Sequence, residues 1–253
     1  MASKTILNYS PNFNPKKRTP KQIKFIIFHY TGMKSESDAL KRLTDIQSEV
    51  SCHYLVKNNG EILKMVPDLY IAWHAGKSSW KNYKSLNQNS IGIEITNPGH
   101  KHGYKNFTKK QITALLKLSK FLIKKYKISP KNILGHSDIA VLRKKDPGEK
   151  FPWEYLSKNK IGIWHTLNKQ DLIKNRKLKI SKIEEGNFFN NLFKVGYSKK
   201  YTKNISKNKY LIELAKTFQR RFRQELVNGK IDQECLLISK SLIKVYNLSL
   251  IHI

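Results

Sequence analysis

The feature that most constrains the fold is an apolar segment near the N-terminus, Ile23–Thr31, with the sequence IKFIIFHYT. Apolar side chains occupy both alternating sets of positions, so both faces of the strand that this segment predicts must be covered. A strand of this kind lies in the centre of a sheet that has other layers of structure on each side. The segment therefore predicts an α/β fold with helices on the faces of a central sheet.

Further elements of such a fold follow over the first 165 residues. Strands are predicted over 52–56, 61–66, 91–96 and 132–135, and helices over 37–50 and from Thr108 to the residue before Pro130. The first two of these strands flank Asn58-Asn59-Gly60, which is a hairpin turn signal. Thr108 and Gln111 have the spacing of a capping box, which marks a helix start.

The sequence changes character after Trp164. Residues 165–182 are polar, basic and weakly periodic, which indicates a linker. Three segments with helical apolar spacing follow, over 184–195, 207–226 and 232–246. We therefore expect a larger domain over residues 1–165, complete enough to fold on its own. A linker over 166–182 and a small three-helix domain over 183–253 would follow it.

The formal net charge of +31 is compatible with two kinds of surface. Most of the 49 basic residues are lysine, and they are spread along the whole chain. Proteins that read nucleic acids more often concentrate their charge and use arginine for bidentate contacts. A solvated basic surface is therefore favoured and no nucleic-acid partner is expected, while attraction to an acidic cell-wall polymer stays open.

No apolar run approaches the roughly 20 residues of a membrane span, so no transmembrane helix is predicted. Residues 1–21 contain no apolar core of a signal peptide, which predicts a cytoplasmic location. The sequence does not indicate an oligomeric state.

Three residues have the donor atoms of a catalytic metal centre. His29 ends the apolar strand, His136 follows a short strand, and Asp146 comes ten residues later. A catalytic zinc ion takes three protein ligands and keeps one position open, which two imidazoles and a carboxylate would satisfy. Spacing alone leaves the alternative open that His29 is a hydrogen-bonded core residue.

Glu94 is a carboxylate on a predicted central strand, where it projects from the face opposite the neighbouring isoleucines. Burial of a carboxylate is costly unless it is paired or functional, so Glu94 is either an ion-pair partner or a general base. The chain has only two cysteines, Cys52 and Cys235, and no disulfide framework or CxxC motif. Cys52 cannot pair with His53, because adjacent strand residues point to opposite faces.

Eight short motifs in a fixed order resemble those of one known family. They are Phe28-His29-Tyr30-Thr31, Ser51-Cys52-His53-Tyr54, Ala72-Trp73-His74-Ala75-Gly76, Ser90-Ile91-Gly92-Ile93-Glu94, Gly135-His136-Ser137-Asp138, Lys144-Lys145-Asp146-Pro147-Gly148, Phe151-Pro152-Trp153 and Ile161-Gly162-Ile163-Trp164. Together they resemble the zinc-dependent N-acetylmuramoyl-L-alanine amidases, relatives of the peptidoglycan recognition proteins. Each motif alone is weak, but eight in this order are specific.

A shorter resemblance covers the C-terminal part of the chain. Phe218–Arg223 and Asn228–Asp232 resemble the three-helix peptidoglycan-binding module that follows the catalytic domain in some of these amidases. Asn228 stands where an acidic residue is usual. This module predicts the cell envelope as the location, in conflict with the absent signal sequence, and the two predictions stay open.

The resemblance implies a mixed central sheet flanked by helices, followed by the small three-helix domain. It also implies that His29, His136 and Asp146 are the ligands of a Zn²⁺ cofactor and that Glu94 is the catalytic glutamate. Lys144, which composition alone would leave as a surface lysine, matches the lysine that assists at the metal centre.

Two further residues, Trp73 and His74, lie in a family segment near the substrate cleft, and the resemblance implies that they contact substrate. The implied reaction is hydrolysis of the amide between N-acetylmuramic acid and L-alanine in peptidoglycan or muropeptides, in cell-wall turnover or recycling. Polymeric wall, released muropeptide and the 1,6-anhydro form all stay open as substrates. The main alternative is a non-catalytic peptidoglycan-binding protein, and a cysteine amidase that uses Cys52 is another.

Overall fold

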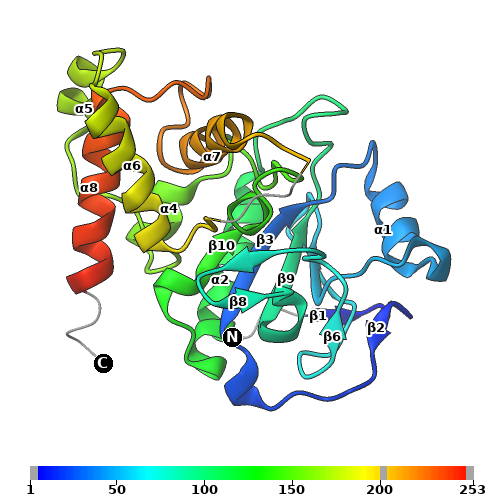
Figure 1. The fold of residues 1–253 in the computed structure, drawn as a ribbon. Coiled ribbons are helices and arrows are strands. Elements are labelled where there is room, and N and C mark those ends of the chain that lie inside the picture. Colours follow the sequence, from blue (N-terminus) through cyan, green and yellow to red (C-terminus); the bar gives the residue numbers. More distant parts are fainter. Residues whose placement is uncertain (1–4, 200–203, 249–253) are drawn as a thin grey trace.

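A six-stranded mixed sheet forms the centre of the computed structural model, which describes residues 5–199 and 204–248 (Figure 1). The strands lie in the order β1-β5-β4-β9-β3-β10, and only the β4–β5 pair is antiparallel. Their bounds are β1 Thr5–Leu7, β3 Phe25–Tyr30, β4 Tyr54–Val56, β5 Ile62–Lys64, β9 Ser90–Ile95 and β10 Ile133–Gly135. The mixed α/β fold expected from the sequence is confirmed.

Shorter strands and the helices surround this sheet. Two small ladders pair β2 (Phe13–Asn14) with β6 (Ile71–Ala72) and β7 (Ser79–Trp80) with β8 (Tyr83–Lys84). The α-helices are α1 Glu36–Thr44, α2 Lys109–Tyr126, α3 His136–Ile139, α4 Trp153–Lys158, α5 Lys169–Asn175, α6 Lys182–Val195, α7 Lys207–Phe222 and α8 Gln233–Leu248. Short 3-10 helices cover Pro20–Gln22, Ile46–Ser48, Leu86–Asn89 and Pro130–Asn132. No helix in the described part of the chain is long and apolar enough to cross a membrane.

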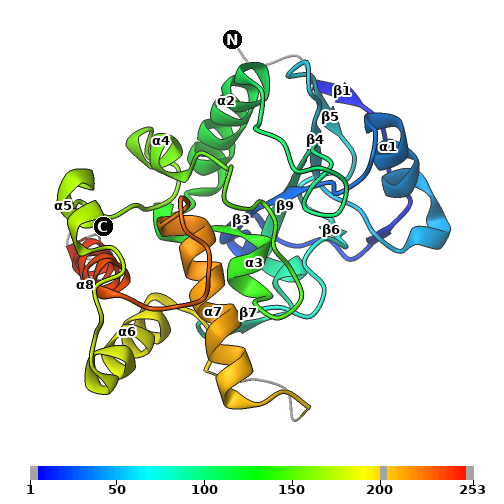
Figure 2. The ribbon, with the colours of Figure 1, turned by 90° about the horizontal axis from the view of Figure 1, so that it is seen from above.

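Strand β3 has the central position that its apolar pattern predicts, with β9 on one side and β10 on the other. Ile26 and Phe28 pack with α2 on one face of the sheet, whereas Phe25 and Ile27 belong to an apolar cluster on the other. Figure 2 shows α2 on one side of the sheet and α3 and α7 on the other.

The predicted capping box begins α2. The Thr108 side chain accepts from the Gln111 backbone N–H at 3.1 Å, and the Gln111 side chain accepts from the Thr108 N–H at 2.9 Å. These two bonds satisfy backbone donors that the first turn would otherwise leave free.

The C-terminal helices do not form a core of their own. Their apolar residues, among them Phe188, Leu214 and Phe218, share one cluster with Phe25 and Ile27 of the central strand. Helix α5 lies inside the segment that the sequence indicates as a linker, and its Leu172 is buried in the same cluster. The division into domains at residue 165 stays a prediction, and residues 1–4, 200–203 and 249–253 of those predicted domains lie outside the described residues.

Because of this shared cluster, we predict that a chain cut after residue 165 does not fold by itself. The sequence alone leads to the opposite expectation, that residues 1–165 fold independently. A chain of residues 1–165 lacks every later member of the apolar cluster that contains Phe25, Ile27, Trp80, Leu134 and Ile139. Loss of burial costs up to about 1.5–3 kcal/mol for each large apolar side chain, against a net stability of about 5–15 kcal/mol for a whole domain. We expect the truncated chain to aggregate and to show no cooperative thermal transition by circular dichroism. A soluble monomer that melts cooperatively would show instead that residues 1–165 fold alone.

Candidate active site

Two parallel strands bring the candidate metal ligands together. In the pairing of β10 with β3, Gly135 lies opposite Phe28, so His136, the first residue of α3, is placed beside His29. Asp146 comes from the loop after α3, where its carbonyl oxygen accepts from the Ser137 backbone N–H at 2.9 Å.

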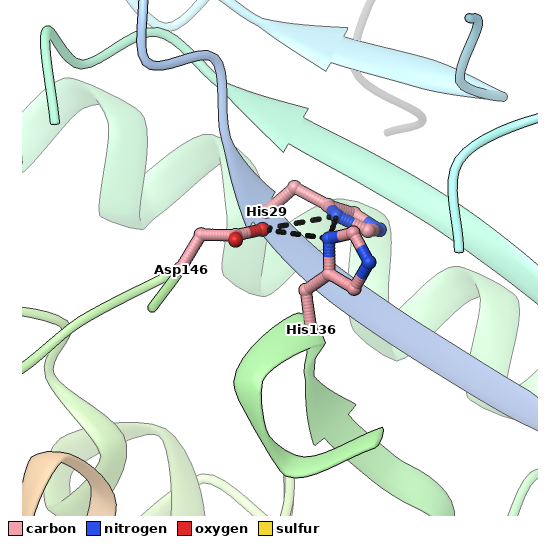
Figure 3. Close-up of side chains that lie close together, drawn as sticks. All are labelled: His29, His136 and Asp146. Carbon is pink, nitrogen blue, oxygen red and sulfur yellow. Dashed lines mark hydrogen bonds and ion pairs between the residues drawn. The ribbon is translucent and has the colours of Figure 1, made fainter. Parts of the chain in front are cut away.

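The three side chains converge on one point (Figure 3). The Nδ1 atoms of His29 and His136 are 2.9 Å apart, and Oδ2 of Asp146 lies 3.1 Å from the first and 3.0 Å from the second. All three residues are buried, and they form a group able to hold a metal ion within the described chain. The structure therefore brings together all three ligands predicted from the sequence.

A chain of hydrogen bonds behind His29 assigns the positions of its protons. The Ser90 hydroxyl donates to the Leu86 carbonyl at 2.6 Å, so its oxygen must accept from Nε2 of His74 at 3.1 Å. Nδ1 of His74 is then an acceptor, and Nε2 of His29 donates to it at 3.0 Å. Burial lowers the pKa of His29 to about 4, which keeps the ring neutral and leaves its Nδ1 without a proton.

His136, the second histidine of the set, also has its proton on Nε2. Nε2 of His136 lies 3.1 Å from the Ala75 carbonyl and donates to it, so with a single proton on the ring Nδ1 has a free lone pair. Two imidazole lone pairs and a carboxylate oxygen thus lie about 3 Å apart with no hydrogen to share between them. Such a set of acceptors is unfavourable unless a cation binds between them, so these residues fit a metal ion.

Glu94 lies next to the metal-ligand set. It is opposite His29 in the β9–β3 pairing. It also lines a cleft with a volume of about 580 Å³, together with His136 and Asp146. Its Oε2 is buried without a hydrogen-bond partner in the described chain. Burial raises the pKa of Glu94 to about 8, and the charge of Asp146 adds to the rise. A side chain whose pKa lies near neutral pH and whose oxygen is free beside a metal site is suited to accept a proton from a reacting group and to return it.

The remaining predicted residues have distinct places. Lys144 lines the cleft together with Glu94, and Trp73 lies at the cleft with 36% of its surface exposed. His74 also lines the cleft, but it is buried and both of its ring nitrogens bond within the chain. A Cβ at Gly92 would lie 2.4 Å from the His74 ring, so only glycine leaves room for this histidine.

Several supporting groups could not be assigned from the sequence. Ser90 begins the motif that ends with Glu94, but its hydrogen bond to His74 depends on the fold. The carbonyl of Ala75 accepts from both His136 and Arg143, and no side-chain pattern marks a carbonyl in advance. Cys52 is fully buried, and burial raises the pKa of its thiol well above the usual value, which disfavours the cysteine amidase alternative.

Comparison with known proteins decides the family. Residues 19–149 match the family model described as N-acetylmuramoyl-L-alanine amidase. The chain belongs to this amidase family. It is 35% identical over 237 residues to the N-acetylmuramoyl-L-alanine amidase AmiD of Escherichia coli, a match that covers 89% of this chain and 84% of AmiD. It is also 33% identical over 167 residues to the 1,6-anhydro-N-acetylmuramyl-L-alanine amidase AmpD of Haemophilus influenzae, covering 58% of this chain and 88% of AmpD.

Solved structures of amidases agree with this assignment. E. coli AmiD in complex with the substrate anhydro-N-acetylmuramic acid-L-Ala-D-γ-Glu-L-Lys matches with a TM-score of 0.76 and 33% identity, over 92% of this chain and 93% of that one. AmpDh3 of Pseudomonas aeruginosa in complex with anhydromuramic pentapeptide matches with a TM-score of 0.76 and 30% identity, over 92% of this chain and 94% of that one. The predicted amidase family and the enzymatic function are confirmed, and the non-catalytic alternative is not supported.

Proposed function

We propose that this amidase holds a zinc ion with His29, His136 and Asp146 and hydrolyses the amide between N-acetylmuramic acid and L-alanine. The observation that carries the proposal is the convergence of two imidazole lone pairs and one carboxylate oxygen within 3.1 Å of one another. Two neutral imidazoles and a carboxylate are a usual ligand set for catalytic zinc, which keeps a further position open for water or substrate.

The substrate class that we propose is the muropeptide with a 1,6-anhydro sugar. AmpD of H. influenzae is named for this form, and the AmiD and AmpDh3 structures contain anhydromuramyl peptides. Products released from the wall would then be cleaved in cell-wall recycling. The peptidoglycan-binding role of residues 183–253 stays a prediction of the sequence resemblance.

The chain's own residues would divide the chemistry between them. When bound, zinc would act as a Lewis acid that polarises the scissile carbonyl and lowers the pKa of a water molecule. The free carboxylate oxygen of Glu94 would accept a proton from the attacking water and return it to the leaving amine of L-alanine. The Lys144 ammonium would stabilise the oxyanion that develops on the carbonyl oxygen, and Trp73 would contact the bound substrate at the cleft.

His74 would then act on the reaction through His29 rather than by touching substrate. Its bond to Nε2 of His29 holds the proton of that ring away from the metal site. Groups of this kind, which orient a metal ligand, commonly contribute 10–100-fold to metal affinity or activity.

Removal of the metal should abolish activity. Dialysis against a chelator should leave protein that does not cleave anhydromuropeptides, and addition of zinc should restore cleavage. The variant His136→Ala should lose zinc in elemental analysis. The variant His165→Ala, whose histidine lies outside the cleft, should keep it. Full activity after verified metal removal would contradict the proposed function.

Replacement of Glu94 should separate binding from chemistry. Glu94→Gln keeps the shape of the side chain and removes the proton acceptor, so the rate should fall about 10²–10⁴-fold with zinc content unchanged. Lys144→Met should also keep zinc and lose about 10²–10³-fold in kcat. Glu154→Gln, at an exposed carboxylate on α4, is the control. A Glu94→Gln protein that loses its zinc would make Glu94 a ligand, and one that keeps its full rate would exclude it as the base.

The hydrogen-bond chain behind His29 should control metal affinity. Ser90→Ala removes the oxygen that accepts from His74, so the His74 ring can reverse its proton and drive the His29 proton onto Nδ1. The Kd for zinc should rise about tenfold or more. Ser119→Ala, at a buried serine of α2 with no hydrogen-bond partner in the described chain, should leave it unchanged. Equal zinc affinities in the two variants would remove His74 from the metal-binding apparatus.

A further inference from the structure

Two buried side chains of the C-terminal part of the chain reach the helix that carries a metal ligand. Tyr197, which follows α6, donates from its hydroxyl to Oδ1 of Asp138 at 2.7 Å. Arg221 of α7 forms an ion pair through Nη1 with Oδ2 of the same carboxylate. Asp138 lies in α3, two residues after His136. Figure 2 shows α7 alongside α3, so the contact joins the C-terminal helices directly to the active site.

The Asp138 carboxylate fixes the backbone at the start of α3. Its Oδ2 accepts from the backbone N–H of Gly135, the residue directly before His136, at 2.8 Å. Two residues after Gly135, the backbone N–H of Ser137 donates to the carbonyl of Asp146 at 2.9 Å. A displacement of Asp138 would therefore move the backbone of His136 and disturb its contact with a second metal ligand.

Arg221 also holds the strand that leads into α3. Its Nη2 donates to the Ile133 carbonyl in β10 at 3.0 Å, and its guanidinium lies 4.2 Å above the ring of Trp153. One guanidinium thus bridges the strand before His136 and the helix that begins with it. Because the side chains of Arg221 and Asp138 are 3% and 1% exposed, neither can exchange this pairing for water without local unfolding.

We propose that Arg221 and Tyr197 are positioning residues of the metal site, which act through Asp138 to hold His136 in its ligating place. The inference rests on the proposed zinc site. It assigns the C-terminal helical part a role in metal binding in addition to its apolar packing. Neither residue touches the ligand atoms, so their effect is on the geometry and affinity of the site.

A second buried arginine of the same helical part provides a matched control. Arg223 pairs through Nη1 with Oδ2 of Asp232 at 2.5 Å, and its side chain is fully buried. The side chains that it contacts by hydrogen bonds or ion pairs, Asn228, Asp232 and Glu234, all belong to the C-terminal part. Arg223→Lys therefore disturbs a buried ion pair of the same type without touching α3 or β10.

The test compares Arg221→Lys, Tyr197→Phe and Arg223→Lys in the full-length chain. Zinc affinity is measured by competition with a chromophoric chelator, the visible spectrum is recorded after loading with Co²⁺, and thermal stability is followed on the same preparations. We expect Arg221→Lys and Tyr197→Phe to weaken zinc binding about 10–100-fold and to change the cobalt spectrum. Arg223→Lys should lower the melting temperature and leave both metal readouts unchanged.

Tyr197→Phe keeps the packing of the ring, so it tests the inference even where Arg221→Lys folds poorly. If Arg221→Lys and Tyr197→Phe bind zinc as wild type does, or no more weakly than Arg223→Lys, the two residues are structural and the inference is overturned while the proposed zinc site stands. If wild type itself binds no zinc, the proposed function fails and this inference with it.

Discussion

The site depends above all on the parallel pairing of three strands. Opposite β3, β9 places Glu94 level with His29, and β10 places Gly135 level with Phe28. A shift of either neighbour by one residue would turn its side chains to the opposite face and separate the carboxylate or the second imidazole from the first. The pattern of β9 opposes such a shift, because Ile91, Ile93 and Ile95 are buried in the apolar cluster that includes α2, whereas Glu94 faces the cleft. Fold stability and the geometry of the reaction therefore have the same physical origin.

The second requirement of the site is that each histidine carries its proton on a defined ring nitrogen, and backbone carbonyls determine which one. The proton of each histidine is held on Nε2 by a chain of hydrogen bonds that ends at a carbonyl, Leu86 for His29 and Ala75 for His136. A carbonyl can only accept, so it sets the direction of every bond before it. Both imidazoles therefore turn Nδ1 toward Asp146. The local electrostatics thus prepare the site for a cation.

Much of the fold could be predicted from local sequence. The pattern of β3, the turn at Asn58-Asn59-Gly60 and the capping box at Thr108 each encode their structure within a few residues, and the structure has all three. The segment 166–182 is predicted as a linker but contains α5. The local signal of this helix is an N-cap at Asn168, and Leu172, its one buried residue, packs in the shared cluster, so tertiary contacts contribute to its stability.

The residues of the candidate site likewise form two groups, those that the sequence identifies and those that only the fold brings into contact. His29, His136, Asp146 and Glu94 could be named because their residue types and order carry the chemistry. Their supporting groups depend on tertiary contacts, as with Ser90 against His74 or Arg221 against Asp138, which are 83 residues apart. No periodicity links residues at such a distance, so these pairings are visible only in the folded chain.

The apolar cluster shared by β3 and the C-terminal helices has a consequence for how such a chain can evolve. In this chain Phe25 and Ile27 belong to one apolar cluster with side chains of α6, α7 and α8, which lie more than 150 residues further along the chain. Because closely packed side chains constrain one another's volume, a change of size on the sheet side of this cluster favours a compensating change on the helices. The two parts of the chain are therefore expected to change sequence in concert.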